Sequence, residues 1–212
     1  MPFYREFELD FASVAVWQIT ESADELLSMV PSDSAAEALM LRGEARRKEW
    51  LAVRLLLARM CGASARIVYD CTGKPVLDGA DGHISISHTR GYALLAYSAD
   101  VPVGIDVELV GRDAISFSRR FMNDAFAASL SGDDAAAKAL VCWCACEALY
   151  KLVGNIGGTY KENVIVKPFE LSGKGAVRLS VKGLRAEHER DYVGVYVNDG
   201  TLLTLLVKGT DV

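Results

Sequence analysis

The chain has 212 residues and a mass of 23.0 kDa, enough for one large domain or two small ones. Apolar residues make up 51% and charged residues 24%, which excludes a disordered or collagen-like protein. Lys and Arg total 23 against 28 Asp and Glu, so the net charge of −5 argues against a general nucleic-acid binder. Any anion site must therefore be local.

The composition also bears on the compartment. No apolar run reaches the roughly 18 to 20 residues of a membrane-spanning helix, and charges interrupt the first ten residues. Five cysteines are an odd number, unlike a secreted disulfide framework. We therefore expect a cytoplasmic protein with reduced thiols and no membrane or nucleic-acid partner. Cys142, Cys144 and Cys146 alternate, but on a helix Cys144 points away from the other two, which disfavours a zinc site.

The residues up to 60 predict two strands, a short helix and a long helix. Apolar-rich stretches at 3–9 and 14–19 are typical of strands. Ser22 stands three residues before Glu25, and this capping-box spacing predicts a short helix from Ser22. Apolar residues at helical spacing then predict one long helix over 35–60.

Two glycines and a turn punctuate the next part of the chain. Gly43 falls within the long helix and weakens that prediction, and Gly62 ends the helix. A strand from Arg66 turns through residues 71–75, and residues 83–110 alternate as expected of three strands. Further helices are predicted over 114–129 and 134–153, and strands over 164–169, 177–183, 192–197 and 201–207.

The order of strands, long helix and strands thus occurs twice, with a join near 100–104. Each long helix also carries a Trp followed by Ala and a basic residue. We expect an α+β fold, a pseudo-dimer of two similar α/β subdomains, each a long helix packed on a small antiparallel sheet. The predicted halves are 1–102 and 103–212.

Asp106 and Glu108 lie two apart on a predicted strand, so both carboxylates project from one face of an apolar segment. Two close anions repel unless they are solvated or held by a cation, and oxygen ligands suit Mg²⁺ or Mn²⁺ better than zinc. The alternative is a strand whose acidic residues face water.

Glu147 and Lys151 stand at i and i+4 on a predicted helix, where a surface ion pair is the simplest explanation. Their neighbours, however, are mostly Ala, Leu, Val, Cys and Trp, which indicates a largely buried helix. If this helix packs on the strand with Asp106 and Glu108, three carboxylates can hold one divalent ion, and Lys151 is available for a phosphate.

A second set of residues suits an anion such as a terminal phosphate. It combines basic side chains with hydroxyls and a protonatable imidazole: Arg54, Lys74, Ser85, Ser87 and His88. Each has an ordinary alternative as a turn, strand or helix-surface residue.

Two segments together resemble a known family. VGIDVE at 103–108 and WCACEALYK at 143–151, preceded by GKP and ISISH, resemble the 4′-phosphopantetheinyl transferase superfamily, whose hallmark is G-[IV]-D-x-E followed by W-x-x-K-E-A-x-x-K. The similarity covers about residues 44–154. The length is similar to the larger monomeric type built of two halves.

The resemblance implies transfer of the 4′-phosphopantetheine arm of coenzyme A to a serine of an apo acyl or peptidyl carrier protein. Adenosine 3′,5′-bisphosphate leaves, and Mg²⁺, or Mn²⁺ in its place, is the cofactor. The metal ligands implied are Asp106, Glu108 and Glu147. Asp106, Glu147 and Lys151 are implied as catalytic residues, with Glu147 also the base for the serine. The coenzyme A contacts implied are Arg54, Lys74, Ser85, Ser87, His88 and Lys151.

Two observations qualify the resemblance. Cys146 replaces the first lysine of the helix motif, and we expect Cys146→Lys to keep or raise activity. Arg112, Arg119 and Arg120 are candidate contacts for an acidic carrier protein or part of a solvated face. The alternatives to a working transferase are a weakened coenzyme A or carrier-binding module and an unrelated metal-dependent phosphoester hydrolase.

Overall fold

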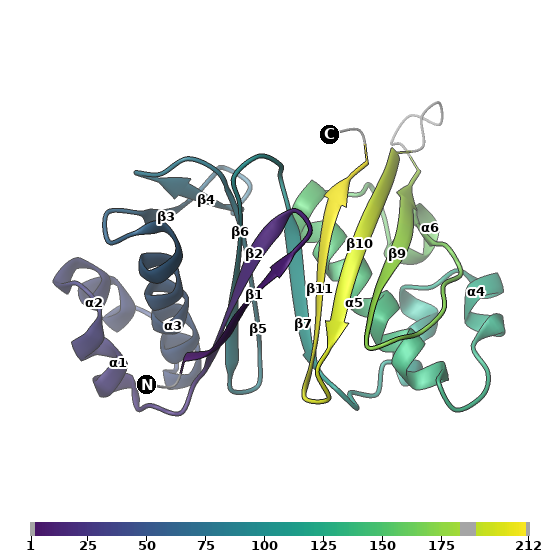
Figure 1. Ribbon diagram of the computed structural model, residues 1–212, viewed down its shortest axis with the longest axis horizontal. Coiled ribbons are helices and arrows are strands. Elements are labelled where there is room, and N and C mark those ends of the chain that lie inside the picture. The colour runs from purple at the N-terminus through teal and green to yellow at the C-terminus, as the bar shows by residue number, and fades with distance from the viewer. Residues whose placement is uncertain (1–2, 183–189, 211–212) are drawn as a thin grey trace. The chain divides into compact units, whose positions relative to one another are not determined.

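A computed structural model describes residues 3–182 and 190–210 of the chain (Figure 1). The chain divides into two compact units, Met1–Asp100 and Val101–Val212. Both units combine helices with antiparallel sheets, so the predicted α+β class is confirmed. Gly183, at the end of one predicted strand, lies outside the described residues. None of the described helices has the length and apolar character needed to cross a membrane.

The first unit contains a four-stranded antiparallel sheet in the order β1-β2-β6-β5, and its helices α1 and α2 pack on α3. The long helix α3 packs on β2 and β6, and its buried side chains include Trp50 and Leu56. A separate two-stranded sheet joins β3 and β4. The elements are β1 (Phe3–Leu9), β2 (Ala12–Gln18), α1 (Ala23–Met29), α2 (Ser32–Leu39), α3 (Glu44–Cys61), β3 (Arg66–Tyr69), β4 (Pro75–Asp78), β5 (His83–Thr89) and β6 (Tyr92–Ser98).

Local signals explain where these helices begin and end. Ser22 caps α1 and its capping box with Glu25 is present, as predicted. The prediction of one helix over 35–60 is wrong, because α2 and α3 are separate. Gly43 stands before α3 with φ of 85°, a left-handed conformation that glycine adopts readily and that interrupts a helix.

The second unit has a five-stranded antiparallel sheet in the order β7-β11-β10-β9-β8. Helix α5 packs on β7 and β11. The elements are β7 (Gly104–Leu109), the 3₁₀ helix η1 (Ile115–Arg120), α4 (Asp124–Ser129), α5 (Ala135–Val153), α6 (Tyr160–Asn163), β8 (Val164–Val166), β9 (Lys174–Val181), β10 (Arg190–Asn198) and β11 (Leu202–Gly209).

The helix predicted over 114–129 is also wrong, since η1 and α4 occupy this stretch as separate short elements. Asn123 accounts for the restart: its side chain accepts a hydrogen bond from the backbone N–H of Phe126 at 2.8 Å and caps α4. Helix α5, by contrast, begins and ends as the sequence predicts.

The strand order has a common part in the two units. In each, the strand before the long helix pairs with the last strand, and the last strand pairs with the strand before it: β2-β6-β5 in the first unit and β7-β11-β10 in the second. The long helix packs on the first two of these three strands in both cases. These shared pairings are compatible with a repeat, and the pseudo-dimer remains a prediction.

Candidate active site

Gly104 sets the distance between β7 and α5. A Cβ built on this glycine would overlap the carbonyl oxygen of Ala148 and lie 2.9 Å from the backbone nitrogen of Leu152. Only a residue without a side chain lets the strand approach the helix backbone so closely. This contact explains the glycine of the VGIDVE segment and places Asp106, two residues along β7, opposite α5.

Most of α5 is buried, and the accessible residues in its second half form one stripe along the helix. From Ala139 to Leu149 every residue is buried except Trp143 and Glu147, and Lys151 continues their spacing of four. The motif residues therefore share one face of the helix. Because the rest of the helix is core, a charged group on this face must find partners rather than bulk water.

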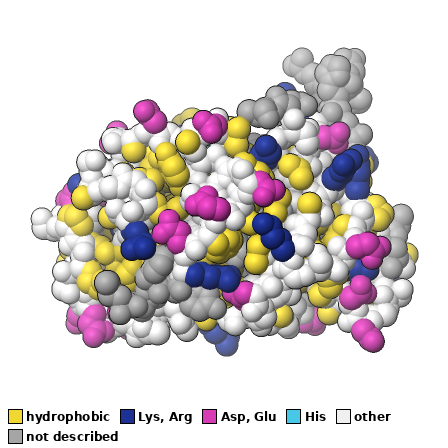
Figure 2. Space-filling model, viewed as in Figure 1, with side chains coloured by type: hydrophobic (Ala, Val, Ile, Leu, Met, Phe, Trp, Pro, Cys, Tyr) yellow, Lys and Arg dark blue, Asp and Glu magenta, His cyan; other side chains and the backbone are white. Residues whose placement is uncertain are grey.

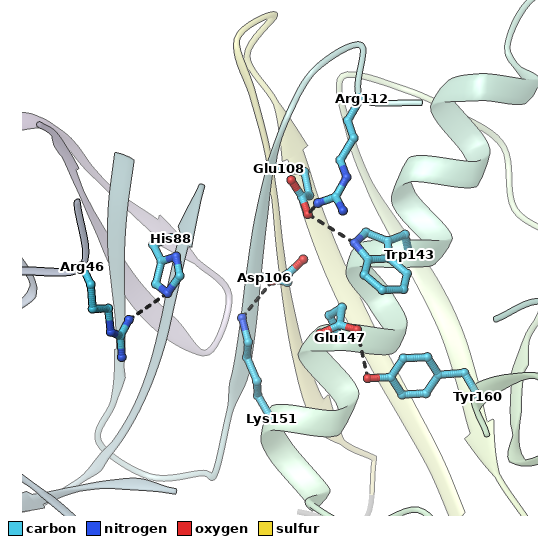
Figure 3. A network of polar contacts seen from close by, with 9 residues as sticks. All are labelled: Arg46, His88, Asp106, Glu108, Arg112, Trp143, Glu147, Lys151 and Tyr160. Carbon is cyan, nitrogen blue, oxygen red and sulfur yellow. Dashed lines mark hydrogen bonds and ion pairs between the residues drawn. The ribbon is translucent and has the colours of Figure 1, made fainter. Parts of the chain in front are cut away.

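Asp106 meets Lys151 on this face (Figure 3). The carboxylate is buried, at 6% exposure, and its Oδ1 accepts a hydrogen bond from Lys151 Nζ at 2.8 Å. Asp106 also interacts with the thiol of Cys144, whose pKa is raised well above its ordinary value by burial first and by the Asp106 charge second. The strand and helix segments singled out by the sequence are thus in direct contact.

Glu147 lies half-buried on the same stripe and accepts a hydrogen bond from the hydroxyl of Tyr160 at 3.0 Å. Burial raises the pKa of Glu147, and the charge of Asp106 raises it further, whereas Tyr160, Lys151 and Arg112 act in the opposite direction. A raised pKa makes this carboxylate a better proton acceptor than an exposed glutamate.

Glu108 belongs to a different group of contacts. Its Oε1 accepts a hydrogen bond from the indole Nε1 of Trp143 at 3.2 Å and forms an ion pair with Arg112. The Arg112 guanidinium also lies over the rings of Phe117 and Trp143, at 5.6 Å from each centroid. Of the three arginines considered for a docking surface, Arg112 is therefore part of this network.

The donor set fits a hard divalent cation in its chemistry. Asp106 and Glu147 supply carboxylate oxygens, and their mutual repulsion is what a cation relieves. Among residues 3–182 and 190–210, no three His, Cys, Asp or Glu side chains already converge as a metal-binding group. Lys151 faces Asp106 and Arg112 faces Glu108, so the three-carboxylate ion site stays a prediction.

His88 is the clearest polar centre of the first unit. Its Nε2 lies 3.0 Å from a guanidinium nitrogen of Arg46, and its Nδ1 lies 3.5 Å from Oε2 of Glu49 (Figure 3). A guanidinium only donates, so Nε2 accepts and the proton sits on Nδ1, facing the carboxylate. The His88 side chain is 42% exposed.

The other residues expected to contact an anion lie on several elements of the first unit. Arg54, on α3, stacks its guanidinium 3.5 Å from the centroid of the Trp50 ring. The pKa of Arg54 is lowered mainly by burial. Lys74, in the β3–β4 turn, is half-buried, and burial lowers its pKa. Ser85 and Ser87 alternate on β5 with the core residues Ile84 and Ile86 and are buried at 3% exposure each, which restricts their hydroxyls as ligand contacts.

The cysteines of α5 are all buried and unpaired by disulfides. Cys146, which replaces the motif lysine, has an exposure of 0% and belongs to the core of the second unit. Its side chain does not share the exposed stripe with Glu147. The expectation that Cys146→Lys keeps or raises activity is therefore not supported by this burial.

Sequence reasoning missed three members of these networks. No sequence pattern singles out Tyr160 or Arg46, and Arg112 is predicted only as a contact for an acidic carrier protein or as part of a solvated face. Arg112 stands four residues after Glu108, a spacing that indicates an ion pair on a helix. Because β7 ends at Leu109 and no helix covers these residues, the spacing alone does not predict the contact. Tyr160 lies in the four-residue helix α6, where no periodic pattern marks it.

The surface charge and the comparisons with known proteins do not indicate a particular function. On the face drawn in Figure 2, Lys and Arg are interspersed with Asp and Glu, so its described part carries no field of a single sign. No protein-family model matches the chain, and no curated protein shows significant similarity to it. The resemblance to phosphopantetheinyl transferases therefore rests on the two motifs and the contacts of their residues.

Proposed function

We propose that the protein transfers the 4′-phosphopantetheine arm of coenzyme A to a serine hydroxyl of an apo acyl or peptidyl carrier protein. One observation carries the proposal: Asp106, Glu147 and Lys151, which belong to two separate motifs, interact inside one unit. Buried acidic residues are costly, and structural ion pairs alone do not require two of them side by side. The motif residues thus form the kind of polar group that phosphoryl-type transfer needs.

The chemistry assigns a task to each side chain. The carrier serine Oγ attacks the pyrophosphate phosphorus nearer the pantetheine, the bond to the bridging oxygen breaks, and adenosine 3′,5′-bisphosphate leaves. Glu147 takes the serine proton on a carboxylate oxygen, and Tyr160 holds that carboxylate in orientation. Lys151 stabilises the negative charge on the phosphate oxygens.

The proposed metal has a limited and defined part. Asp106 and Glu147 would hold Mg²⁺, which supplies positive charge to the pyrophosphate when it is bound. Lys151 would then exchange its contact with Asp106 for one with a phosphate oxygen. The flexible lysine stem suits such an exchange.

The same proposal assigns coenzyme A contacts to the first unit. Arg54, Lys74 and His88 supply the cationic or protonatable groups, and Arg46 adds a guanidinium beside His88. Since Ser85 and Ser87 are buried, we expect the basic side chains to contribute most of the affinity.

The transfer is tested by incubating the protein with coenzyme A, Mg²⁺ and apo acyl carrier protein, and measuring the intact mass of the carrier. The wild type is expected to add one phosphopantetheine arm. Asp106→Asn and Glu147→Gln should lose about 100-fold or more in rate, since each removes a charge that acts in the transition state. Asp134→Asn is the matched control, because Asp134 is an acidic residue at the start of α5, paired with Lys138.

Absence of a mass gain with both acyl and peptidyl carriers would overturn the transferase. Binding of coenzyme A without transfer would support the alternative, a weakened coenzyme A or carrier-binding module, which the loss of the motif lysine at Cys146 favours. Release of inorganic phosphate without any carrier would instead support a hydrolase.

We further infer that the two units are copies of one α/β motif, supported by the shared pairings β2-β6-β5 and β7-β11-β10. A cytoplasmic location is part of the same proposal, because the free cysteines fit a reducing compartment. The expected partners are coenzyme A and a carrier protein. The chain is expected to act as a monomer.

A further inference from the structure

Asp106 and Glu108 are equivalent by sequence, two carboxylates on one face of β7, but their surroundings differ. We infer that Glu108 is a positioning residue that fixes Trp143 and Arg112, and that Asp106 and Glu147 alone are the protein ligands of the divalent ion. The inference rests on the proposed function, and it departs from the three-carboxylate site that the resemblance implies.

The geometry of strand and helix separates the two carboxylates. Residues two apart on a strand are about 6.6 Å apart along it, and residues four apart on a helix are about 6 Å apart along its axis. Glu108 therefore lies level with Trp143, to which it is hydrogen-bonded, and Asp106 lies level with Glu147 and Lys151 of α5 (Figure 3). Glu108 is one helical turn away from Glu147.

The contacts of Glu108 oppose its release. Its Oε1 accepts from both the Trp143 indole and the Arg112 guanidinium, and the Glu108 side chain is only 11% exposed. The Arg112 guanidinium lies over Phe117 and Trp143, whose own rings meet edge to face with centroids 5.1 Å apart. Turning Glu108 toward an ion would remove the acceptor from the indole and the counter-ion from a guanidinium placed over two rings.

Asp106 has an exchangeable partner instead. Lys151 is a flexible ammonium at the end of α5, and the proposed reaction offers it a phosphate. A divalent ion can therefore replace Lys151 at Asp106 while the Lys151 ammonium gains a phosphate oxygen as its new partner. The two carboxylates of β7 thus have different roles: Asp106 binds the ion, and Glu108 holds Trp143 and Arg112 in position.

The indole N–H of Trp143 reports the position of Glu108 directly. The chain has only three tryptophans, Trp17, Trp50 and Trp143, so ¹⁵N-tryptophan labelling gives three indole N–H resonances, assigned by Trp→Phe variants. Metal-free Glu108→Ala defines where the Trp143 resonance lies once the carboxylate is removed. Glu108→Gln gives a second reference if the alanine variant does not fold. Trp17, whose indole donates to Glu21 at 3.3 Å, is the internal control.

Mg²⁺ is then titrated into the wild-type protein, and binding is measured in parallel by the loss of the free Mn²⁺ signal in electron paramagnetic resonance. We expect the Trp143 resonance to stay away from its Glu108→Ala position at saturating Mg²⁺. Asp106→Asn and Glu147→Gln should weaken Mn²⁺ binding by more than the roughly tenfold caused by loss of an outer contact. Glu108→Gln should weaken it less than either.

Movement of the Trp143 resonance onto the Glu108→Ala position with Mg²⁺ would overturn the inference, as would a Glu108→Gln defect in Mn²⁺ binding equal to that of Asp106→Asn. These results leave the transferase intact. A wild type that takes up no Mn²⁺ overturns the metal-dependent function and the ligand assignment together. A wild type that binds Mn²⁺ but never modifies a carrier overturns the transferase, and the indole resonance still decides the role of Glu108.

Discussion

The two long helices, α3 and α5, handle charge in opposite ways. Each packs on the strand before it and on the last strand of its unit. Helix α3 has exposed charged residues such as Arg46, whose side chain is 52% exposed, although its Arg54 is partly buried against Trp50. Helix α5 is buried along most of its length, and its charged residues Glu147 and Lys151 contact groups on α6 and β7.

This difference shows where a charged motif carries information. A charge in water costs little, so the polar contacts of α3 need no function to explain them. A charge at the edge of a core must be stabilised by partners. On α5, Lys151 contacts the motif residue Asp106, and Glu147 contacts Tyr160 of α6. The acidic groups on α5 and β7 are therefore stronger evidence for a function than the exposed acidic groups of the first unit.

The largest effect is expected at Gly104, where the second unit depends on close approach of strand and helix. Gly104→Ala forces β7 and α5 apart, because the new methyl would overlap the Ala148 carbonyl. Overpacking of rigid backbone costs about 3 kcal/mol or more, and we expect residues 101–212 to lose their folded structure. Urea denaturation followed by circular dichroism measures the loss.

Gly173→Ala is the matched control in the same unit. A Cβ there would come no closer than 4.0 Å to the nearest backbone oxygen, that of Asn198, so its stability should stay near that of the wild type. Equal stability of Gly104→Ala and Gly173→Ala would show that the strand–helix distance is not set by Gly104.

Cys146→Lys tests the burial of α5 from the inside. The thiol is fully buried in the core, so the lysine places an ammonium among apolar side chains. An uncompensated buried charge costs about 3–5 kcal/mol, and activity should fall with stability. Cys71→Lys, in an exposed turn of the first unit, should change the free energy of unfolding by no more than about 0.5 kcal/mol. A stable, active Cys146→Lys would mean that this face of α5 opens to solvent.

These contrasts mark how far the sequence could be interpreted. The apolar neighbours of Glu147 predict a buried helix, and α5 is buried along most of its length. The contact of that helix with the strand of Asp106 is only a condition at the level of sequence, and the hydrogen bond from Lys151 to Asp106 meets it. The capping box at Ser22 can also be predicted from sequence, because it depends on two residues three positions apart. Local rules suffice where the deciding atoms are close in the chain.

The remaining features depend on packing between distant segments. Nothing near Tyr160 in sequence indicates that it bonds to Glu147, and the separation of Glu108 from Asp106 appears only when Trp143 is opposite it. The break at Gly43 was a known weakness of the predicted helix, but glycine alone does not decide whether a helix bends or ends. The burial of Ser85 and Ser87 likewise depends on packing that the sequence of β5 alone does not show.

The smallest effect is expected for Arg46→Met, compared with the same chemical change at Lys151. Arg46 contacts His88 at 3.0 Å from an exposed position, so its loss should change the free energy of unfolding by less than about 0.5 kcal/mol. Lys151→Met leaves the buried Asp106 carboxylate without its ammonium and should cost about 2 kcal/mol.

Both variants are measured by urea denaturation in EDTA, and again with Mg²⁺. If the ion binds at Asp106, Mg²⁺ should restore part of the loss in Lys151→Met, because a cation again faces the carboxylate, and should leave Arg46→Met unchanged. Equal losses of unfolding free energy for the two variants in EDTA would show that charges on α3 and α5 contribute alike to stability. Restoration of Arg46→Met rather than Lys151→Met would move the cation site to the first unit, to the exposed contact of Arg46 with His88.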